Sequence, residues 1–473
     1  MLIHTKRTLV KIYIFFSGLL ILYLSFLNTK YKQITCKEKN EKIDIWPNLK
    51  LEYVNLENYN ETNLFETQQF KCKKFETPGW CKGILNHEKE TLTLVEKYIE
   101  IHPKQPINMM HYSNLLDNCT NFKKIRNYSN LNNINITYIS YAINIFKDFE
   151  QVERLIRALY QSSTLFCIHV DSKSSLIFHN TVHKYAKCFE NIFVASTSYR
   201  VKWGDASVLM PDIVCMSDLL KLRFEIAQKY PQKAWKYLIN LTGQEFPLKT
   251  NLQISQYLNL LNGSNDITGS QKRFEMDRIK YEWNHEWSEK YQQLVLVKSK
   301  LIKEKMNLNI TFYKGDVHGI FTYKMVEFIV HDKKSKDYLK YIWNTGHASE
   351  HYWNVLNYNQ YFNVPGGYMG PNNMSEEYSV EPTFRLKHWI GLNHIEKKCH
   401  GKIVRGLCIF GIGDLHWLIN RRELFVNKFH LTYQSLALDC LEMWLKKETC
   451  AGSKLNFSYN SPIIKFSRKD GCE

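Results

Sequence analysis

The strongest constraint on the fold is an alternation of strand-like and helix-like patterns that begins at Thr137. Short runs of apolar and β-branched residues, typical of buried strands, alternate with longer segments whose apolar residues recur at helical spacing. The expected strands are TYISYAINIF (137–146), TLFCIHVD (164–171), IFVAS (192–196) and WKYLINL (235–241). The expected helices are FEQVERLIRALYQ (149–161) and IVCMSDLLKLRFEIAQ (213–228). This alternation predicts an α/β fold with an open, mostly parallel central sheet.

Acidic residues follow two of the expected strands. Asp171 ends the second strand, and the turn TGQE (242–245) follows the fourth strand and contains Glu245. Ligands of open parallel sheets bind beyond the carboxyl ends of the strands, so both acids are expected beside a ligand site. A strand-end acid can also cap a helix, and the pattern alone does not choose between these roles for Asp171.

The N-terminus carries a membrane-anchor pattern. Residues 12–27, IYIFFSGLLILYLSFL, contain no charge, and basic residues flank them on both sides. A membrane span needs roughly 17–25 mostly apolar residues, which this run reaches together with its neighbours. The sequence after it offers no small-x-small cleavage site, so a retained anchor is expected, with the basic N-terminal side in the cytosol. The predicted organisation is a cytoplasmic tail (1–11), a signal-anchor transmembrane helix (12–29), a lumenal stem (30–80) and a folded domain (81–473).

Cysteines and glycosylation sequons agree with a lumenal domain. The twelve cysteines include no C-x-x-C pair, so in an oxidising lumen they indicate disulfides rather than a zinc site. Nine N-x-S/T sequons occur, and Asn240 lies in an expected strand. Glycosylation is predicted at Asn60, Asn118, Asn127 and Asn135.

The net charge of +17 does not by itself identify a partner. Lysine and arginine residues are scattered along the chain, and no nucleic-acid-binding motif accompanies them. A phosphorylated small molecule or an anionic membrane face accounts for the charge equally well, and no nucleic-acid partner is expected.

A glycine-containing stretch near the C-terminus, VRGLCIFGIGDLHWLINRRELFVNKFH (404–430), resembles a nucleotide loop only superficially. Its GIGDLH lacks the third glycine of a dinucleotide fingerprint and lies far from the first strand. We expect Gly411 and Gly413 to form a turn and Asp414 to cap a helix over 415–425. The chain also contains no D-x-D motif, so fixed cations such as Arg405 and Lys428 are candidates for neutralising a leaving diphosphate.

Several segments together resemble the core-2/I-branching β-1,6-N-acetylglucosaminyltransferase family. They run in order from about residue 80 to 445 and include ERLIRALY (153–160), CIHVD (167–171), CFENIFVAS (188–196), CMSDL (215–219), WKYLINLTGQEFPLKTNL (235–252), VPGG (364–367), RLKHW (385–389), VRGLCIFGIGDLHWL (404–418) and LFVNKF (424–429). The resemblance implies a GT-A-like glycosyltransferase fold in a type II Golgi membrane protein. It further implies a UDP-sugar donor, an O-glycan acceptor, inversion at the anomeric carbon, and no metal or other cofactor.

The resemblance also assigns roles to individual residues. Arg405 and Lys428 match the family's two cations that hold the UDP diphosphate, and Asp171 matches an acid near the uridine. Glu350, in HASEHYWNV (347–355), matches the catalytic base, although Ser349 replaces the acid that precedes it in the family pattern. From sequence physics alone, Glu350 would instead be a solvated glutamate at the start of a helix.

The acceptor side is less well defined. Trp389 either stacks on a sugar or packs in the core, and Glu245 either contacts the acceptor or holds its turn. Two segments depart from the family pattern. In NDITGS (265–270), Thr268 or Gly269 stands where the family has an acid that contacts the acceptor, and KGDVHG (314–319) introduces Asp316 and His318. These departures leave open the transfer of glucose or xylose instead of N-acetylglucosamine (GlcNAc), and also a catalytically silent glycan-binding protein.

The resemblance implies four disulfides: Cys81–Cys440, Cys119–Cys188, Cys167–Cys215 and Cys399–Cys408. Cys36, Cys72, Cys450 and Cys472 are left over. Cys36 follows the expected anchor closely and is a candidate for linking two chains in a homodimer.

Overall fold

The computed structural model describes residues 77–105, 107–128, 137–271, 274–306, 308–370, 384–390, 398–456 and 462–473. Its centre is a six-stranded sheet with the order β3-β2-β1-β4-β9-β6. The strands are β1 (Ile139–Ile145), β2 (Leu165–Val170), β3 (Ile192–Val194), β4 (Tyr237–Thr242), β6 (Asp266–Ile267) and β9 (Gly319–Thr322). Strands β3, β2, β1 and β4 pair in parallel, whereas β9 pairs antiparallel with β4 and β6. The predicted α/β class and the four predicted strands are therefore confirmed.

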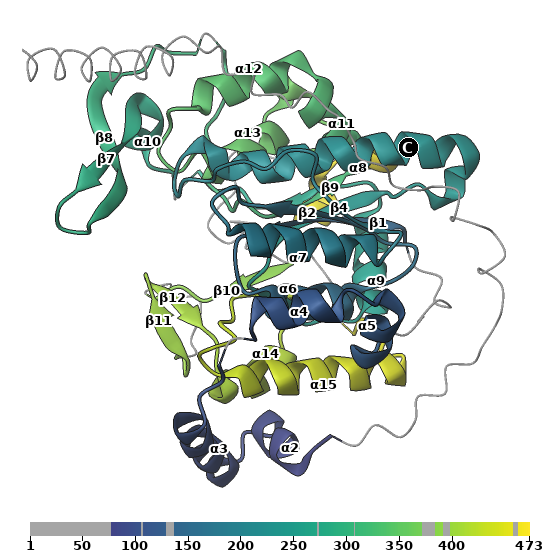
Figure 1. The fold of residues 1–473 in the computed structure, drawn as a ribbon. Helices are drawn as coiled ribbons and strands as arrows, with labels where there is room; N and C mark the ends of the chain where they lie inside the picture. Colours follow the sequence, from purple (N-terminus) through teal and green to yellow (C-terminus); the bar gives the residue numbers. More distant parts are fainter. Residues whose placement is uncertain are drawn as a thin grey trace, which may run out of the picture. The chain divides into compact units, whose positions relative to one another are not determined.

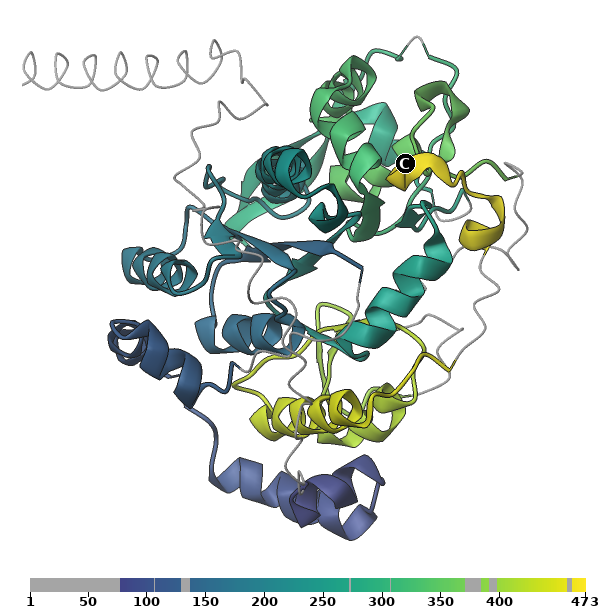
Figure 2. The same ribbon diagram turned by 90° about the vertical axis from the view of Figure 1, so that its right-hand side faces the viewer.

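Helices cover both faces of this sheet, as the crossover connections of parallel strands require. Figures 1 and 2 show α6 (Phe149–Leu159) and α8 (Met210–Lys229) on opposite faces. In Figure 1, α7 (Leu176–Lys187) lies on the side of α6, and α11 (Tyr323–His331) lies on the side of α8. Both predicted helices are present within two or three residues of their expected bounds.

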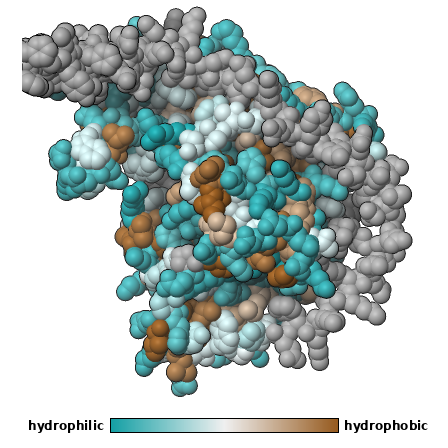
Figure 3. All heavy atoms as spheres, in the orientation of Figure 1, coloured by the Kyte–Doolittle hydropathy of each residue, from teal (hydrophilic) through white to brown (hydrophobic). Residues whose placement is uncertain are grey.

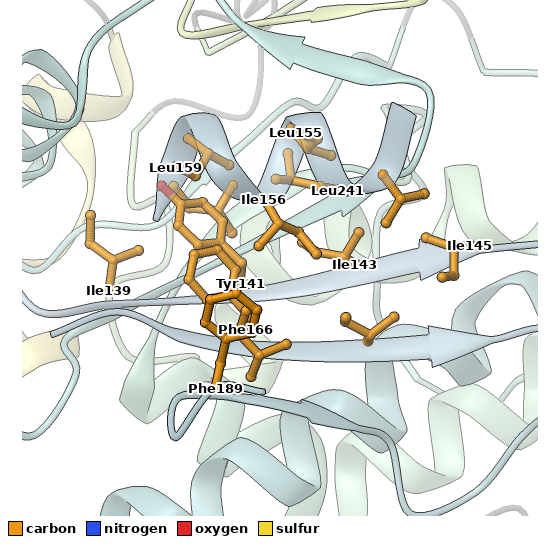
Figure 4. Close-up of a cluster of buried hydrophobic side chains, with 14 of the residues drawn as sticks. Ile139, Tyr141, Ile143, Ile145, Leu155, Ile156, Leu159, Phe166, Phe189 and Leu241 are labelled. Atoms are coloured by element: carbon orange, nitrogen blue, oxygen red, sulfur yellow. The ribbon is translucent and has the colours of Figure 1, made fainter. Parts of the chain in front are cut away.

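The core under the sheet is formed by β1, β2, α6 and their neighbours. Figure 4 shows Leu155, Ile156 and Leu159 of α6 facing Tyr141 and Ile143 of β1, all of them buried. Burying each such side chain contributes about 1.5–3 kcal/mol. The apolar positions of α6 recur at helical spacing, which explains why this helix could be recognised from its sequence.

A smaller mixed sheet with the order β10-β13-β5 lies beside α14 and α15. Its strands and helices are β5 (Glu245–Pro247), β10 (Arg385–Lys387), β13 (Phe425–Asn427), α14 (Leu415–Ile419) and α15 (Ser435–Ala451). The predicted helix over 415–425 is wrong in length: α14 ends at Ile419, and the chain leads from there into β13, which pairs with β5 and β10. Asp414 does not cap α14: its carboxylate accepts the Gly411 N–H at 2.9 Å and the His400 N–H at 2.9 Å.

Four N-terminal helices precede the sheet: the first two pack in the core beside the smaller sheet, and the last two pack in the core of the main sheet. They are α2 (Gly79–Leu85), α3 (Lys89–Ile101), α4 (Met109–Leu115) and α5 (Cys119–Ile125). The disulfide Cys81–Cys440 ties α2 to α15, and Cys119–Cys188 ties α5 to the end of α7. Cys167–Cys215 and Cys399–Cys408 are also present, so all four implied pairs are confirmed. Cys450 is disulfide-bonded too, and Cys472 carries a free thiol.

Upstream of the base candidate, α10 (Met276–Lys280) leads into a hairpin of β7 (Tyr281–Ser288) and β8 (Gln293–Ile302). The hairpin projects from the sheet at the left of Figure 1. The base of the hairpin is fixed by the Trp283 N–H, which donates to the Asn344 carbonyl at 3.0 Å. Figure 3 shows a mainly hydrophilic face in which hydrophobic side chains form small, separate groups.

The remaining helices pack on the elements already described. They are α9 (Asn251–Leu261), α12 (Lys333–Ile342), α13 (Tyr352–Tyr358) and α16 (Pro462–Phe466), with a short β-hairpin of β11 (Lys402–Val404) and β12 (Leu407–Ile409). Short 3-10 turns are η3 (Ala206–Leu209), η4 (Pro231–Lys233), η5 (Ala348–Glu350), η6 (Gln360–Phe362), η8 (Ile412–Asp414) and η9 (Asp470–Cys472).

The predicted tail, anchor and most of the stem lie outside the described residues, as do Asn60, Asn135, Cys36 and Cys72. Within the described part of the chain, none of the helices has the length and apolarity that a membrane span requires. Asn118 and Asn127 are exposed, whereas Asn240 is buried and its amide donates to Asp212 at 2.8 Å.

Candidate active site

The carboxyl ends of β1, β2 and β4 lie at one edge of the sheet, because these strands pair in parallel. Asp171 follows β2 directly and is buried. One of its carboxylate oxygens accepts the Lys173 N–H at 2.9 Å, and Lys173 Nζ lies 3.5 Å from the other. Asp171 thus closes the turn after the strand, at the edge where it was expected.

Glu245 lies after β4 but faces the protein interior. Its side chain has 0% exposure and forms an ion pair with Arg385, which is also 0% exposed. The Glu245 carboxylate also accepts a hydrogen bond from Asn427 Nδ2 at 2.8 Å and from Thr242 Oγ1 at 3.1 Å. These internal contacts favour the role of holding the turn over direct contact with an acceptor.

A chain of polar contacts extends from Glu245 towards the surface. His318 Nε2 lies 2.9 Å from Glu245 Oε1, and His318 Nδ1 lies 3.0 Å from Asp316 Oδ1. The same Asp316 oxygen accepts a hydrogen bond from Lys387 Nζ at 2.7 Å. The nearby ammonium of Lys387 and the His318 ring outweigh the effect of burial and hold the pKa of Asp316 well below its usual range. The segment KGDVHG, which departs from the family pattern, is therefore built into this buried network through Asp316 and His318.

Arg405 and Lys428 are presented by neighbouring elements. Arg405 occupies the two-residue turn between β11 and β12, with φ +51° followed by φ +79° at Gly406. Positive φ at both positions suits the tight turns that match the twist of a hairpin. The disulfide Cys399–Cys408 anchors β12 of this hairpin. Lys428 follows β13, whose Asn427 pairs with Lys387 of β10.

These cations form a positively charged cluster. Neither the Arg405 guanidinium nor the Lys428 ammonium has a hydrogen bond or ion pair with another described residue. Burial lowers the pKa of Lys428, and three nearby cations lower it further: Lys147, Arg405 and Lys387. Cations that repel one another without a bound counter-charge are favourable for binding an anion such as a diphosphate. The structure thus brings the two predicted cations together and adds Lys147 and Lys387, which sequence reasoning missed.

Glu350 ends the short 3-10 turn η5 and remains accessible, with 32% of its side chain exposed. Arg278 Nη1 donates to Glu350 Oε2 at 2.7 Å, and Lys314 Nζ lies 3.5 Å from the same oxygen. Arg278 and Lys314 were not singled out from the sequence, since each is one basic residue in a charged segment without a recognisable spacing. The exposed carboxylate can receive a proton from a hydroxyl group that approaches from solvent.

The Glu350 segment and the Asp316 segment are joined through the backbone. The Gly315 N–H donates to the Glu350 carbonyl at 2.9 Å, and the indole of Trp353 donates to the Val317 carbonyl at 2.9 Å. A Cβ at Gly315 would collide with the Asn354 side chain and the Thr268 backbone, so this close approach requires glycine. Glu350 is thereby connected, through residues 315–316 and Lys387, to the cation cluster.

Trp389 lies beside the Arg405 turn. It forms a β-bridge with Leu407, and its neighbour Ile390 donates its N–H to the Gly406 carbonyl at 2.9 Å. The indole retains 42% exposure, which excludes full core packing and leaves a face available for stacking on a sugar.

Within the described residues, one group of His, Cys, Asp and Glu side chains has the spacing of metal ligands: Cys399, Cys408 and Asp414. The two sulfurs form a disulfide, and both Asp414 oxygens accept backbone hydrogen bonds. Thiolates are the metal ligands of cysteine, so this group does not fit a metal ion. It serves the hairpin that presents Arg405.

Comparison with known proteins assigns the class. The profile of the Core-2/I-Branching enzyme family matches residues 139–419, which include Asp171, Glu245, Glu350 and Arg405. The chain therefore belongs to the Core-2/I-branching enzyme family, and it is a glycosyltransferase.

Its relatives include the mouse N-acetyllactosaminide β-1,6-N-acetylglucosaminyl-transferase, which is 32% identical over 312 residues, or 66% of this chain and 73% of the relative. The human counterpart is 33% identical over 308 residues, covering 65% and 72% of the two chains. The human β-1,3-galactosyl-O-glycosyl-glycoprotein β-1,6-N-acetylglucosaminyltransferase 3 is 29% identical over 387 residues, covering 79% and 84%. The central mostly parallel sheet agrees with the GT-A-like fold expected for this family.

Proposed function

We propose that this chain transfers GlcNAc from UDP-GlcNAc, in a β-1,6 linkage, to an O-glycan that contains galactose or N-acetylgalactosamine. The three relatives are named as β-1,6-N-acetylglucosaminyltransferases, and the names of two of them give N-acetyllactosaminide as the acceptor. The observation that carries the proposal is that the accessible Glu350 and the cation cluster share neighbours. The Glu350 backbone accepts a hydrogen bond from Gly315, the next residue Asp316 binds Lys387, and Lys387 and Arg405 are close enough to Lys428 to lower its pKa. Such an arrangement suits a displacement between an acceptor hydroxyl and a leaving diphosphate.

In the proposed mechanism, Glu350 is the general base. It takes the proton of the acceptor hydroxyl, the 6-OH for a β-1,6 linkage, as the oxygen attacks the anomeric carbon. One displacement from the face opposite the leaving group inverts the configuration. A single base is sufficient, because the leaving diphosphate is stabilised by cations and needs no second carboxylic acid.

Arg405 and Lys428 stabilise the departing UDP without a metal ion in this scheme. The planar guanidinium of Arg405 can bind two phosphate oxygens at once, and the Lys428 ammonium adds a point charge. Asp171 contacts the uridine, and Trp389 stacks on an acceptor sugar. No cofactor is required.

Localisation follows from the sequence patterns and remains part of the proposal. The chain would be a single-pass type II protein of the Golgi membrane with its catalytic domain (81–473) in the lumen, and Cys36 would link two chains in a homodimer. Non-reducing electrophoresis of wild-type protein and Cys36→Ser tests that linkage directly.

Turnover of the full-length protein in detergent tests the reaction. UDP release and product formation are measured with UDP-GlcNAc, UDP-glucose and UDP-xylose, a core-1 acceptor, and EDTA present. Glu350→Gln should abolish transfer and leave UDP binding near normal, while Glu100→Gln, an exposed change on α3, should retain wild-type turnover. Substantial turnover by Glu350→Gln would eliminate Glu350 as the base. Glycan binding without UDP release by the wild type would favour the second candidate, a silent glycan-binding protein, to which the altered segments 265–270 and 314–319 point.

A further inference from the structure

Asp316 lies between the segment that carries Glu350 and the cluster formed by Arg405, Lys428, Lys147 and Lys387. Its preceding residue, Gly315, donates its N–H to the Glu350 carbonyl at 2.9 Å. On the other side, Asp316 Oδ1 accepts a hydrogen bond from Lys387, which is close enough to Lys428 to lower the pKa of its ammonium. Asp316 is thus in contact with the base segment and with the cation cluster.

The two carboxylate oxygens of Asp316 have different surroundings. Oδ1 receives Lys387 Nζ at 2.7 Å and His318 Nδ1 at 3.0 Å. Oδ2 has no hydrogen-bond partner among the described residues, and this oxygen is not fully buried. The side chain retains 15% exposure. One oxygen is therefore held by the protein, and the other keeps its capacity to accept a hydrogen bond from a ligand.

The rest of the residue is held firmly. The Asp316 N–H donates to Thr268 Oγ1 at 2.9 Å, and His318 is itself fixed on its far side by Glu245. An ionised carboxylate with a fixed orientation is an acceptor-only group, so a ligand that reaches Oδ2 must supply hydrogen-bond donors. Sugar hydroxyl groups are such donors.

The transferred sugar must lie between the base and the leaving diphosphate. Its anomeric carbon is bonded to the diphosphate in the donor, and in the product it is bonded to the acceptor oxygen that the base has deprotonated. We propose that Asp316 binds hydroxyl groups of the donor sugar through Oδ2 and acts as a determinant of donor specificity. This inference rests on the proposed function, since it takes Glu350 and the cation cluster as the two ends of the reaction. It gives a role to the segment 314–319, one of the two that depart from the family pattern.

Binding of UDP and of UDP-GlcNAc, without acceptor, separates a sugar contact from other roles. Calorimetry of the full-length protein compares the wild type, Asp316→Asn and a matched control, Asp470→Asn, which removes the charge of an aspartate paired with Arg468. Asp316→Asn should weaken UDP-GlcNAc binding about tenfold or more, the loss expected for a charged hydrogen bond, and should change UDP binding less than about twofold. Asp470→Asn should change neither.

Deoxy donors identify the hydroxyl. Among the 3-, 4- and 6-deoxy analogues of UDP-GlcNAc, at least one should bind the wild type more weakly than UDP-GlcNAc but bind Asp316→Asn as well as UDP-GlcNAc does. If Asp316→Asn does not fold, Asp316→Glu keeps the charge but displaces the carboxylate, and it should give the same selective loss of UDP-GlcNAc binding.

Equal weakening of UDP and UDP-GlcNAc would overturn the inference, because it would show that Asp316 only positions Lys387 for the diphosphate. Unchanged binding of both would also overturn it. A wild type that binds UDP but transfers no GlcNAc would refute the proposed function, while the comparison of the two affinities would still decide the role of Asp316. A wild type that binds no UDP would overturn both.

Discussion

Replacing Glu245 by glutamine would test whether this acid serves the fold or the acceptor. The substitution keeps the shape of the side chain and removes its charge. Glu245 and Arg385 are both fully buried, and burial lowers the pKa of Arg385 to about 9. In Glu245→Gln the Arg385 guanidinium loses the carboxylate with which it is directly paired. It keeps the electrostatic effect of Asp212, and Nη2 keeps its hydrogen bond to the Asn240 carbonyl at 3.0 Å.

The expected cost follows from these contacts. Removing one partner of a buried ion pair typically destabilises a protein by about 3–5 kcal/mol, because a buried charge is left uncompensated. A glutamine that keeps its carbonyl oxygen at the Oε1 position, which accepts hydrogen bonds from Asn427 and Thr242, would place its NH2 donors against the Arg385 guanidinium. Because natural proteins are stable by about 5–15 kcal/mol, the variant would lose a large part of its stability.

Urea unfolding with disulfides intact, followed by the fluorescence of the buried Trp235 and Trp353, gives the measurement. Asp337→Asn is the control, since it breaks the exposed pair with Lys333 and should cost only a few tenths of a kcal/mol. A double variant, Glu245→Gln with Arg385→Met, should be more stable than Glu245→Gln alone, because the orphaned charge is gone. Wild-type stability in Glu245→Gln, together with a raised KM for acceptor, would refute the reasoning and return Glu245 to the acceptor site.

Four further predictions address the site and the fold. Arg405→Ala should weaken UDP binding by about tenfold to a hundredfold in calorimetry, since a charge-assisted contact is lost. Unchanged affinity would remove this residue from the diphosphate site. Turnover of the wild-type protein should persist in EDTA, and a requirement for added manganese would contradict the metal-free scheme. His351 donates Nδ1–H to the Tyr313 carbonyl at 3.0 Å, while its buried Nε2 has no partner among the residues that the structure describes, and burial lowers its pKa to about 4. The unfolded state, with a pKa of about 6.5, binds the proton first, so up to about 3 kcal/mol of stability should be lost as pH falls from 6.5 to 4. That loss should be shallower in His351→Asn, and an unchanged pH profile would exclude this histidine as its source. Replacing Cys399 and Cys408 by serine should lower the free energy of unfolding by about 2–3 kcal/mol in the chain-entropy model. It should also weaken UDP binding, because the strand beside Arg405 is released. UDP affinity equal to that of the wild type would show that the hairpin keeps its geometry without the bond.

The central sheet could be predicted because its signals are local. Strands β1 and β2 and helix α6 each bury a face that is visible as a run or a period in their own residues. The helix over 415–425 was predicted too long for the complementary reason: after Ile419 the chain leaves the helix, and residues 424–427 bond to the β5 and β10 segments, which lie far away in the sequence. Tertiary pairing decided that segment against its local pattern.

By itself, the sequence determined the α/β class, the mostly parallel character of the central sheet and the family. Resemblance to that family supplied the four disulfides and the candidates Glu350, Arg405 and Lys428. Only the tertiary structure paired Arg278 with Glu350, buried Glu245 against Arg385, and joined Asp316 to Lys387. The physical reason is that these ion pairs link residues tens to more than a hundred positions apart. No local periodicity records such a contact, because it forms only when separate elements pack at the same edge of the sheet.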